Sequence, residues 1–199
     1  MVFYGLSWQE FLQIRGPISR SRNVHLTYSQ GTLEITRPLE LHEFSAELMA
    51  VFIRVLVREF GLNIKSMGST TIDKERLDRS AEPDKAYYIQ NQPLVVGRFV
   101  DFEQDPPPDL VVEVDITHTD IDKLNLYANM GVPEFWRYNG RVWRIYRLVE
   151  GVYQETEVSP TFPLVEKTKL YEFLAIAKQD EMRAEQMLSD WVKVQLSDS

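Results

Sequence analysis

Residues 105–116 read Asp-Pro-Pro-Pro-Asp-Leu-Val-Val-Glu-Val-Asp-Ile. The prolines form a rigid entry into residues 110–116, a run that is apolar on both strand faces apart from its acids. A strand with one face in water alternates apolar and polar residues, whereas a strand covered on both sides is a nearly continuous apolar run. The sequence therefore predicts a buried strand at the centre of a sheet.

Two acidic side chains interrupt this strand. Strand alternation places Glu113 and Asp115 on one face and Val112 and Val114 on the other. A buried carboxylate needs a cation, a metal ion or several hydrogen-bond donors nearby. An arginine partner for Glu113 would meet that need without any catalytic role, and Asp115 can equally be a structural acid.

The flanking sequence alternates helix and strand patterns. Apolar residues at spacings of three and four predict a helix over 40–60 that stops at Gly61. The other expected elements are a helix over 7–14 with a Ser7–Glu10 capping box, a hairpin over 24–28 and 32–36, strands over 62–72 and 86–89, a polar loop over 73–82, an edge strand or loop over 94–100, a helix over 118–130, strands over 134–138, 142–148 and 152–157, and one or two helices over 168–196.

This order predicts an α/β fold, with a mixed β-sheet core flanked by helices, an N-terminal β-hairpin and a C-terminal helix. The 199 residues show no repeat and no linker, so we expect one domain over 1–199. Its core is expected over about 24–175 and its helical tail over about 168–196. Trp136, Trp143 and Tyr146 are expected as core or dimer-interface aromatics.

Composition restricts the function further. The chain has no cysteine, which excludes disulfides, thiolate zinc sites and cysteine nucleophiles. No apolar run is long enough for a membrane span, and the N-terminus lacks the pattern of a secretory signal, so we expect a cytoplasmic protein without a membrane partner.

The formal net charge of −8 is unusual for a protein that grips DNA by its phosphates. The charge is uneven, because residues 1–37 hold four arginines against two acids, a local +2. Three of these arginines are candidate nucleic-acid contacts, against the alternative that they lie in a solvated loop: Arg15, Arg20 and Arg22.

Two further residues complete a candidate site with Glu113. Asp84 follows Pro83 at the entry to the 86–89 strand, and it approaches Glu113 if that strand pairs with 110–116. Two such carboxylates, with water and the Val114 carbonyl, suit Mg²⁺ or Mn²⁺. Lys123 lies ten residues after Glu113, on the helix that follows the central strand, and could orient or activate a water and stabilise charge on a phosphorane. The alternatives are that Asp84 only starts a strand and that Lys123 lies in solvent.

Several stretches together resemble the cyanobacterial "putative restriction endonuclease" family (Uma-two type) of the PD-(D/E)XK nuclease superfamily. The resemblance covers about residues 7–175. It rests on Leu26-Thr-Tyr-Ser-Gln-Gly-Thr-Leu-Glu-Ile35, Gly68-Ser-Thr-Thr71, Glu82-Pro-Asp-Lys-Ala-Tyr-Tyr-Ile-Gln-Asn91, Asp105-Pro-Pro-Pro-Asp-Leu-Val-Val-Glu-Val-Asp-Ile-Thr117 and Gly131-Val-Pro-Glu-Phe-Trp-Arg-Tyr138.

The resemblance implies a restriction-endonuclease-like fold, a Mg²⁺-dependent endonuclease acting on nucleic acid, DNA first, and a homodimer. Asp84 and Glu113 match its metal ligands. The superfamily pattern expects a lysine where this chain has Asp115, and Lys123 is the candidate replacement from the following helix. A further acid or substrate contact is expected from the 40–60 helix, with His42, Glu43 and Glu47 as candidates.

Two other functions remain open on the sequence. One is a non-catalytic binding or assembly protein that keeps the nuclease fold with vestigial acids, which the net charge of −8 favours. The other is a metal-dependent hydrolase of a small phosphate ester. A nuclease requires Asp84, Glu113 and Lys123 to converge in a cleft wide enough for a nucleic-acid strand. A scaffold allows Lys123 to point away or an arginine to neutralise Glu113, and a small-ester hydrolase requires a closed pocket with no flanking groove.

Overall fold

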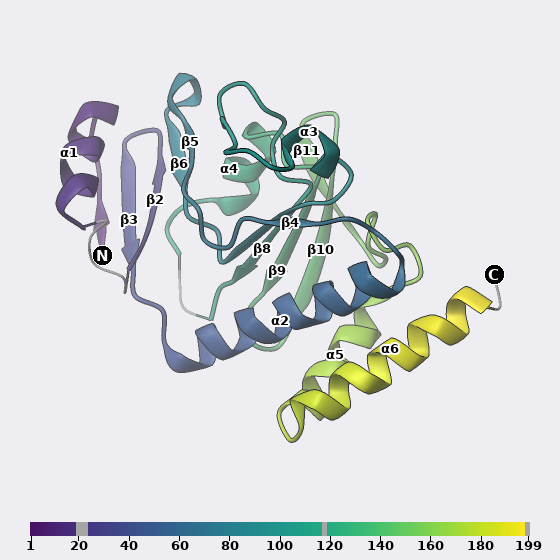
Figure 1. Ribbon diagram of the computed structural model, residues 1–199. Helices are drawn as coiled ribbons and strands as arrows, with labels where there is room; N and C mark the ends of the chain where they lie inside the picture. The colour runs from purple at the N-terminus through teal and green to yellow at the C-terminus, as the bar shows by residue number, and fades with distance from the viewer. Residues whose placement is uncertain (19–23, 117–118, 198–199) are drawn as a thin grey trace.

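The core of the protein is a six-stranded mixed sheet with helices on both faces (Figure 1). The computed structural model describes residues 1–18, 24–116 and 119–197. The strand order is β11-β10-β9-β8-β7-β4. The bounds are β4 (Lys65–Ser66), β7 (Lys85–Tyr88), β8 (Leu110–Val114), β9 (Glu134–Tyr138), β10 (Trp143–Val149) and β11 (Val152–Thr156). The predicted α/β class and mixed sheet are confirmed.

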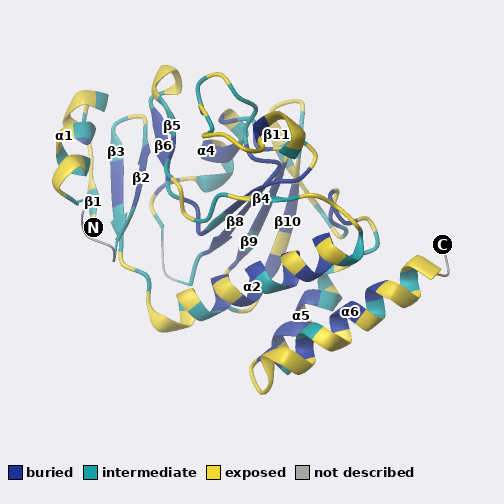
Figure 2. Ribbon diagram, in the orientation of Figure 1, coloured by how far each residue is buried: buried dark blue, intermediate teal, exposed yellow. Residues whose placement is uncertain are grey.

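The strand β8 lies at the centre of this sheet, as its apolar sequence predicts. All five of its residues are buried, and Figure 2 shows β8 in the buried colour. It pairs antiparallel with β7 and parallel with β9, and the other strand pairs recorded in this sheet are antiparallel. The parallel pair follows from the helical crossover that joins β8 to β9.

The two faces of the large sheet carry separate hydrophobic clusters. The cluster on one face joins Val112, Val114 and Trp136 to three helices, α2 (Glu40–Glu59), α5 (Lys167–Ala177) and α6 (Glu181–Ser197). The cluster on the other face joins Val111 and Phe135 to α4 (Lys123–Asn129). Strand alternation therefore puts Glu113 on the α4 face.

A second sheet of five strands stands beside the first. Its order is β1-β3-β2-β6-β5, and the predicted N-terminal hairpin forms its centre (Figure 1). The helix α1 (Trp8–Ile18) packs on it through Phe11 and Tyr28. The strand bounds are β1 (Val2–Phe3), β2 (His25–Ser29), β3 (Thr32–Thr36), β5 (Ile72–Lys74) and β6 (Arg79–Ala81).

The aromatic side chains expected in the core are buried. Trp136 and Trp143 are 0% exposed, with ring centroids 4.7 Å apart, and Tyr146 stacks near Phe135. The tail forms two helices, α5 and α6. The capping box is also confirmed, since Ser7 N donates to Glu10 and Glu10 N donates to Ser7 Oγ.

Three local predictions are wrong. The strand expected over 62–72 is interrupted after β4, where Gly68 adopts φ +57°. The loop expected over 73–82 contains the end of β5, the short 3₁₀ helix η1 (Glu75–Leu77) and β6. Over 94–100 the loop alternative is confirmed from Val96 onward, after Leu94 and Val95 have closed α3 (Gln92–Val95). The helix expected from residue 118 begins at Lys123, because Asp122 caps it by accepting from Asn125 N.

The reason for the errors near β6 is a long-range pairing. Ala81 pairs with Thr27 on β2, far away in sequence, and Ile72 pairs with Ala81. Strand pairing of this kind stabilises segments whose own sequence pattern is weak. Within the described ranges, no helix is both long and apolar enough to span a bilayer.

Candidate functional site

Two buried carboxylates from neighbouring strands meet at one end of the large sheet. Asp84 directly precedes β7, and its Oδ2 accepts a hydrogen bond of 2.7 Å from the backbone N–H of Val114. This contact ties Asp84 to the residue that follows Glu113 on β8. Asp84 is 6% exposed and Glu113 3% exposed. The pairing expected between these strands is confirmed, with Lys85 opposite Val112.

Lys123 reaches over the end of β8 from the first turn of α4. Its Nζ lies 2.6 Å from Oε2 of Glu113 and 2.7 Å from Oδ1 of Asp115. Two of the three ammonium protons are used in this way, and among the described residues the third has no recorded partner. The carboxylates of Glu113 and Asp115 outweigh the effect of burial, which lowers a lysine pKa, and together they raise the pKa of Lys123. Lys123 is therefore a cation and a hydrogen-bond donor in this site.

Glu113 is held between two donors from the same helix. Oε2 accepts from Lys123, and Oε1 accepts from the hydroxyl of Tyr127, one helical turn further on. Burial raises the pKa of Glu113 to about 7, Lys123 opposes the rise, and the charges of Asp84 and Asp115 add to it. Glu113 thus changes its protonation state near neutral pH when no metal ion is present.

Two histidines flank the carboxylate of Asp84. His42 Nε2 lies 3.2 Å from Oδ2, and His25 Nδ1 lies 3.4 Å from Oδ1. Burial by itself would raise the pKa of Asp84. The hydrogen bonds from His25 and His42, together with the charge of Lys123, outweigh burial and hold that pKa below its ordinary value. Asp84 is therefore ionised while Glu113 titrates near neutral pH.

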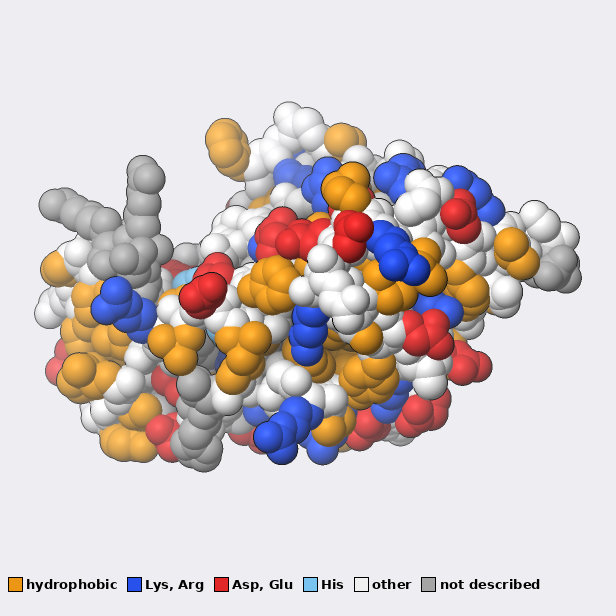
Figure 3. All heavy atoms as spheres, turned by 90° about the horizontal axis from the view of Figure 1, so that it is seen from below, with side chains coloured by type: hydrophobic (Ala, Val, Ile, Leu, Met, Phe, Trp, Pro, Cys, Tyr) orange, Lys and Arg blue, Asp and Glu red, His pale blue; other side chains and the backbone are white. Residues whose placement is uncertain are grey.

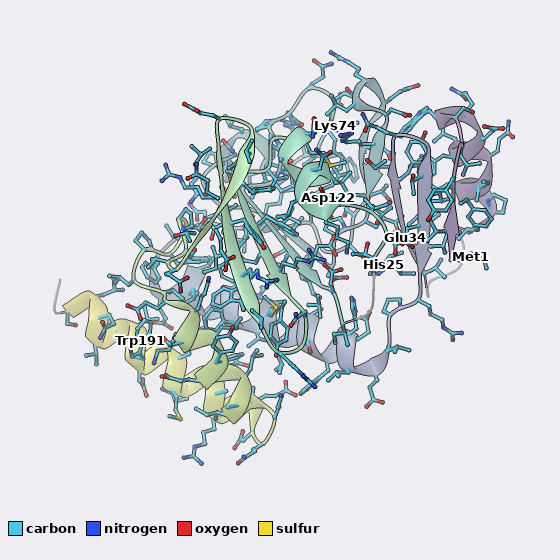
Figure 4. The ribbon with its side chains drawn as sticks, turned by 180° about the vertical axis from the view of Figure 1, so that it is seen from behind. Met1, His25, Glu34, Lys74, Asp122 and Trp191 are labelled. Carbon is cyan, nitrogen blue, oxygen red and sulfur yellow. The ribbon has the colours of Figure 1, made fainter. Side chains whose placement is uncertain are left out.

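These side chains line one cavity between the two sheets, with an open volume of about 50 Å³. Such a volume holds an ion with a few waters. Figure 4, seen from behind, labels His25 and Glu34 on the small sheet near the strands of the large sheet. The lining comprises His25, Thr27, Glu34, Thr36, Arg37, Pro38, Leu39, His42, Glu82, Asp84, Glu113, Val114, Asp115, Ile116, Thr119 and Lys123.

The charge balance of the cavity fits a divalent cation. Five of its lining residues are acids and two are bases, a surplus of three negative charges with neutral histidines and ionised acids. The available ligands are carboxylate and carbonyl oxygens, which Mg²⁺ and Mn²⁺ prefer. Within the described ranges, no three His, Asp or Glu side chains are grouped to hold a metal ion. A Mg²⁺ ion here would therefore rely on two carboxylates, the Val114 carbonyl and water, and Mg²⁺ commonly keeps several waters.

The accessory candidates have different surroundings. Asp115 lines the cavity and accepts from Lys123 and from Arg137 Nε at 2.7 Å. His42 also lines it. Glu43 and Glu47 are not among the lining residues, and their side chains are 64% and 65% exposed. Glu47 instead accepts from Lys85 at 3.0 Å.

Of the three arginine candidates for nucleic-acid contact, Arg15 is the one that the structure describes, and its surroundings do not support the role. Arg15 is paired with both carboxylate oxygens of Asp73 at 2.7 and 2.8 Å. Arg20 and Arg22 lie outside the described residues.

Several neighbours of the site were not foreseen from the sequence. Tyr127 could have been found, because it lies four positions after Lys123 and therefore on the same helix face. Glu34, which accepts from Thr119 Oγ1 at 2.6 Å, and His25 gave no local signal. Both come from the small sheet, whose position depends on the tertiary fold.

Comparison with known proteins supports the nuclease-like fold. The family Uma2, described as "Putative restriction endonuclease", matches residues 8–177. A solved structure from Anabaena variabilis ATCC 29413, described as "a putative nuclease belonging to DUF820", is similar with a TM-score of 0.52 and 17% identity, covering 84% of this chain and 98% of that chain. At this identity the similarity concerns the fold alone. No curated protein matches the chain.

Proposed function

The chain belongs to the Uma2 family of "putative restriction endonucleases", and from that premise we propose that it is a Mg²⁺- or Mn²⁺-dependent endonuclease that hydrolyses phosphodiester bonds in DNA. The observation that carries the proposal is the convergence of Asp84, Glu113 and Lys123 on one buried cavity. A homodimer in the cytoplasm is part of the proposal.

Asp84 and Glu113 are the proposed metal ligands, together with the Val114 carbonyl. The flanking hydrogen bonds from His25 and His42 keep Asp84 ionised and restrict its rotation. A bound Mg²⁺ would act as a Lewis acid on the phosphate and lower the pKa of a bound water.

Lys123 is the proposed electrostatic group of the reaction. Its raised pKa keeps it protonated, so it is unsuited to accept a proton from water. Its third N–H can donate to the attacking water or to a phosphate oxygen, where the ammonium stabilises the negative charge that develops in the transition state. The contacts to Glu113 and Asp115 hold Nζ in place for this role.

The contacts of the site favour an active enzyme over a scaffold with vestigial acids. Lys123 points to Glu113, and Arg137 pairs with Asp115 at 2.7 Å. The net charge of −8 remains the argument for a scaffold. Figure 3 shows Lys, Arg, Asp and Glu side chains interspersed with hydrophobic ones on the face seen from below, without one extended basic area. A DNA substrate that approaches this face meets no extended basic surface, and the proposal requires a local cationic contact near the cavity.

The proposal is tested by calorimetric titration of Mg²⁺ and Mn²⁺ into the wild type and Asp84→Asn, with nicking of supercoiled plasmid in the same buffers. Glu134→Gln is the matched control, because Glu134 is also a buried acid of the large sheet but lies outside the cavity lining. Metal binding and nicking that are lost only in Asp84→Asn would support the nuclease. A wild type that binds neither metal would overturn it in favour of the scaffold.

A further inference from the structure

Two arginines extend from the cavity along the same face of the large sheet. Arg137 on β9 lies opposite Glu113 on β8, and Arg144 on β10 lies opposite Arg137. Residues that face each other on neighbouring strands project from the same side of a sheet. The row Glu113–Arg137–Arg144 therefore leads outward from the proposed metal ligands on the face that carries α4.

Stability does not explain this pair of like charges. Two cations directly opposite each other on adjacent strands repel and destabilise the sheet. Arg137 is held by one hydrogen bond, from Nε to Asp115, and within the described ranges its two terminal nitrogens have no partner. The side chain is 29% exposed, so these nitrogens are accessible to a ligand.

Arg144 is even less satisfied by its neighbours. Its side chain is 44% exposed, and the nearest carboxylate recorded for it in the described part of the chain is that of Glu155, at 3.8 Å. Glu155 is itself bound by Lys167 Nζ at 2.8 Å. The Arg144 guanidinium is thus only weakly paired, and its planar fork of donors suits phosphate oxygens.

The two arginines occupy directly opposed positions on neighbouring strands. Their backbones lie about 4.8 Å apart, so two long side chains can present guanidinium groups side by side to neighbouring anionic groups of one ligand. Neither Arg137 nor Arg144 is among the residues that line the cavity, so a small phosphate ester held within it would leave both unused. The row therefore fits a polymer that enters the cavity at one phosphate and continues beyond it.

We propose that Arg137 and Arg144 form a nucleic-acid backbone subsite that holds the phosphates next to the one being cleaved. This inference rests on the proposed nuclease function and adds to it the direction in which the substrate strand leaves the cavity. It also resolves the difficulty of the net charge, because two arginines beside the cavity supply a local cationic contact on an acidic protein.

The test is the binding of a fluorescein-labelled DNA duplex, followed by anisotropy over a series of salt concentrations in EDTA and, separately, in Ca²⁺. The variants are Arg144→Gln and Arg137→Gln, with Arg144→Lys as the conservative change. Arg147→Gln is the matched control, because Arg147 is an exposed arginine on the same strand β10 but lies on the opposite sheet face by alternation. Far-UV circular dichroism verifies that each variant is folded.

The association constant for DNA falls as the salt concentration rises, and on a log–log plot each phosphate contact adds about −0.9 to the slope. Loss of one contact should therefore make the slope shallower by about 0.9, which corresponds to about eightfold weaker binding near 0.1 M salt. We expect this loss in Arg144→Gln and Arg137→Gln, near-normal binding in Arg144→Lys, and wild-type binding in Arg147→Gln. Equal effects of all three Gln variants, or no DNA binding by the wild type, would overturn the subsite. Since EDTA removes metal ions, failure of the metal site is detected separately by calorimetry and nicking.

Discussion

Lys123 Nζ lies 2.6 Å from Oε2 of Glu113, with side chains that are 12% and 4% exposed. The two residues belong to different elements, the first turn of α4 and the centre of β8. A buried pair of this kind repays the desolvation of both charges only while both partners are present. The same contact joins the stability of the protein to its proposed chemistry.

Removal of the lysine should therefore destabilise the protein. Lys123→Met leaves Glu113 and Asp115 without their shared cation, and we expect the free energy of unfolding to fall by on the order of 3 kcal/mol. Urea unfolding measures it. The double variant Lys123→Met/Glu113→Gln should recover part of the loss.

The control for this prediction is Lys85→Met. Lys85 pairs with Glu47 at 3.0 Å, but Glu47 is 65% exposed. Exposed pairs contribute about 0–1 kcal/mol, so little change is expected. Equal losses in Lys85→Met and Lys123→Met would contradict the role assigned to the buried pair.

The metal-free protein should lose stability as the pH rises from about 4.5 to about 7. Burial raises the pKa of Glu113 from 4.5 to about 7, so in this window the folded chain binds a proton that the unfolded chain lacks. Stability falls with pH where the folded state binds more protons. The raised pKa values of His25 and His42 act in the same direction above pH 6.5.

Urea unfolding in EDTA at pH 5 and pH 8 checks this prediction. Glu113→Gln has no ionisable group at this position. Its free energy of unfolding should therefore fall less than that of the wild type between pH 5 and pH 8, and the difference between the two decreases should be about 1–3 kcal/mol. An identical pH dependence in the wild type and Glu113→Gln would show that Glu113 does not titrate in this range.

Mg²⁺ should compete with the proton on Glu113. At pH 6 most of the protein carries this proton, and at pH 8 little does, so affinity for Mg²⁺ should rise about tenfold between these pH values. Calorimetry at pH 6 in two buffers of different ionisation enthalpy should detect the released proton. Binding at pH 6 without proton release would place the metal ion away from Glu113.

Glu134 should prove a structural acid. It is 1% exposed, and its carboxylate accepts from Trp136 Nε1 at 2.6 Å, Ser159 Oγ at 2.7 Å and Thr161 N at 2.9 Å. Glu134→Ala leaves these donors unpaired and should destabilise by about 3 kcal/mol or more. Glu134→Gln keeps an acceptor and should cost less, and thermal unfolding of both variants measures the difference. A loss of Mg²⁺ binding in Glu134→Gln would contradict this assignment.

The sequence alone identified the central strand and the helices on either side of it. An apolar run on both faces of residues 110–116 has few alternatives to a buried strand, and the three-and-four spacing over 40–60 has few alternatives to a helix. It also indicated that Glu113 needs a partner, because an acid inside an apolar strand is costly to bury. Asp84 and Lys123 became candidates through their expected places beside that strand and through the resemblance to the nuclease family. The predictions of the strand and the helix are confirmed because their signal lies in residues close together in the chain.

Only the tertiary structure brought in the rest. The strands β5 and β6 exist because they pair with each other and with the distant β2, and His25 approaches Asp84 because the small sheet stands beside the large one. The row from Glu113 to Arg144 likewise depends on strand register. Register and packing join residues far apart in sequence, and a local pattern carries no record of which distant strand will be the neighbour.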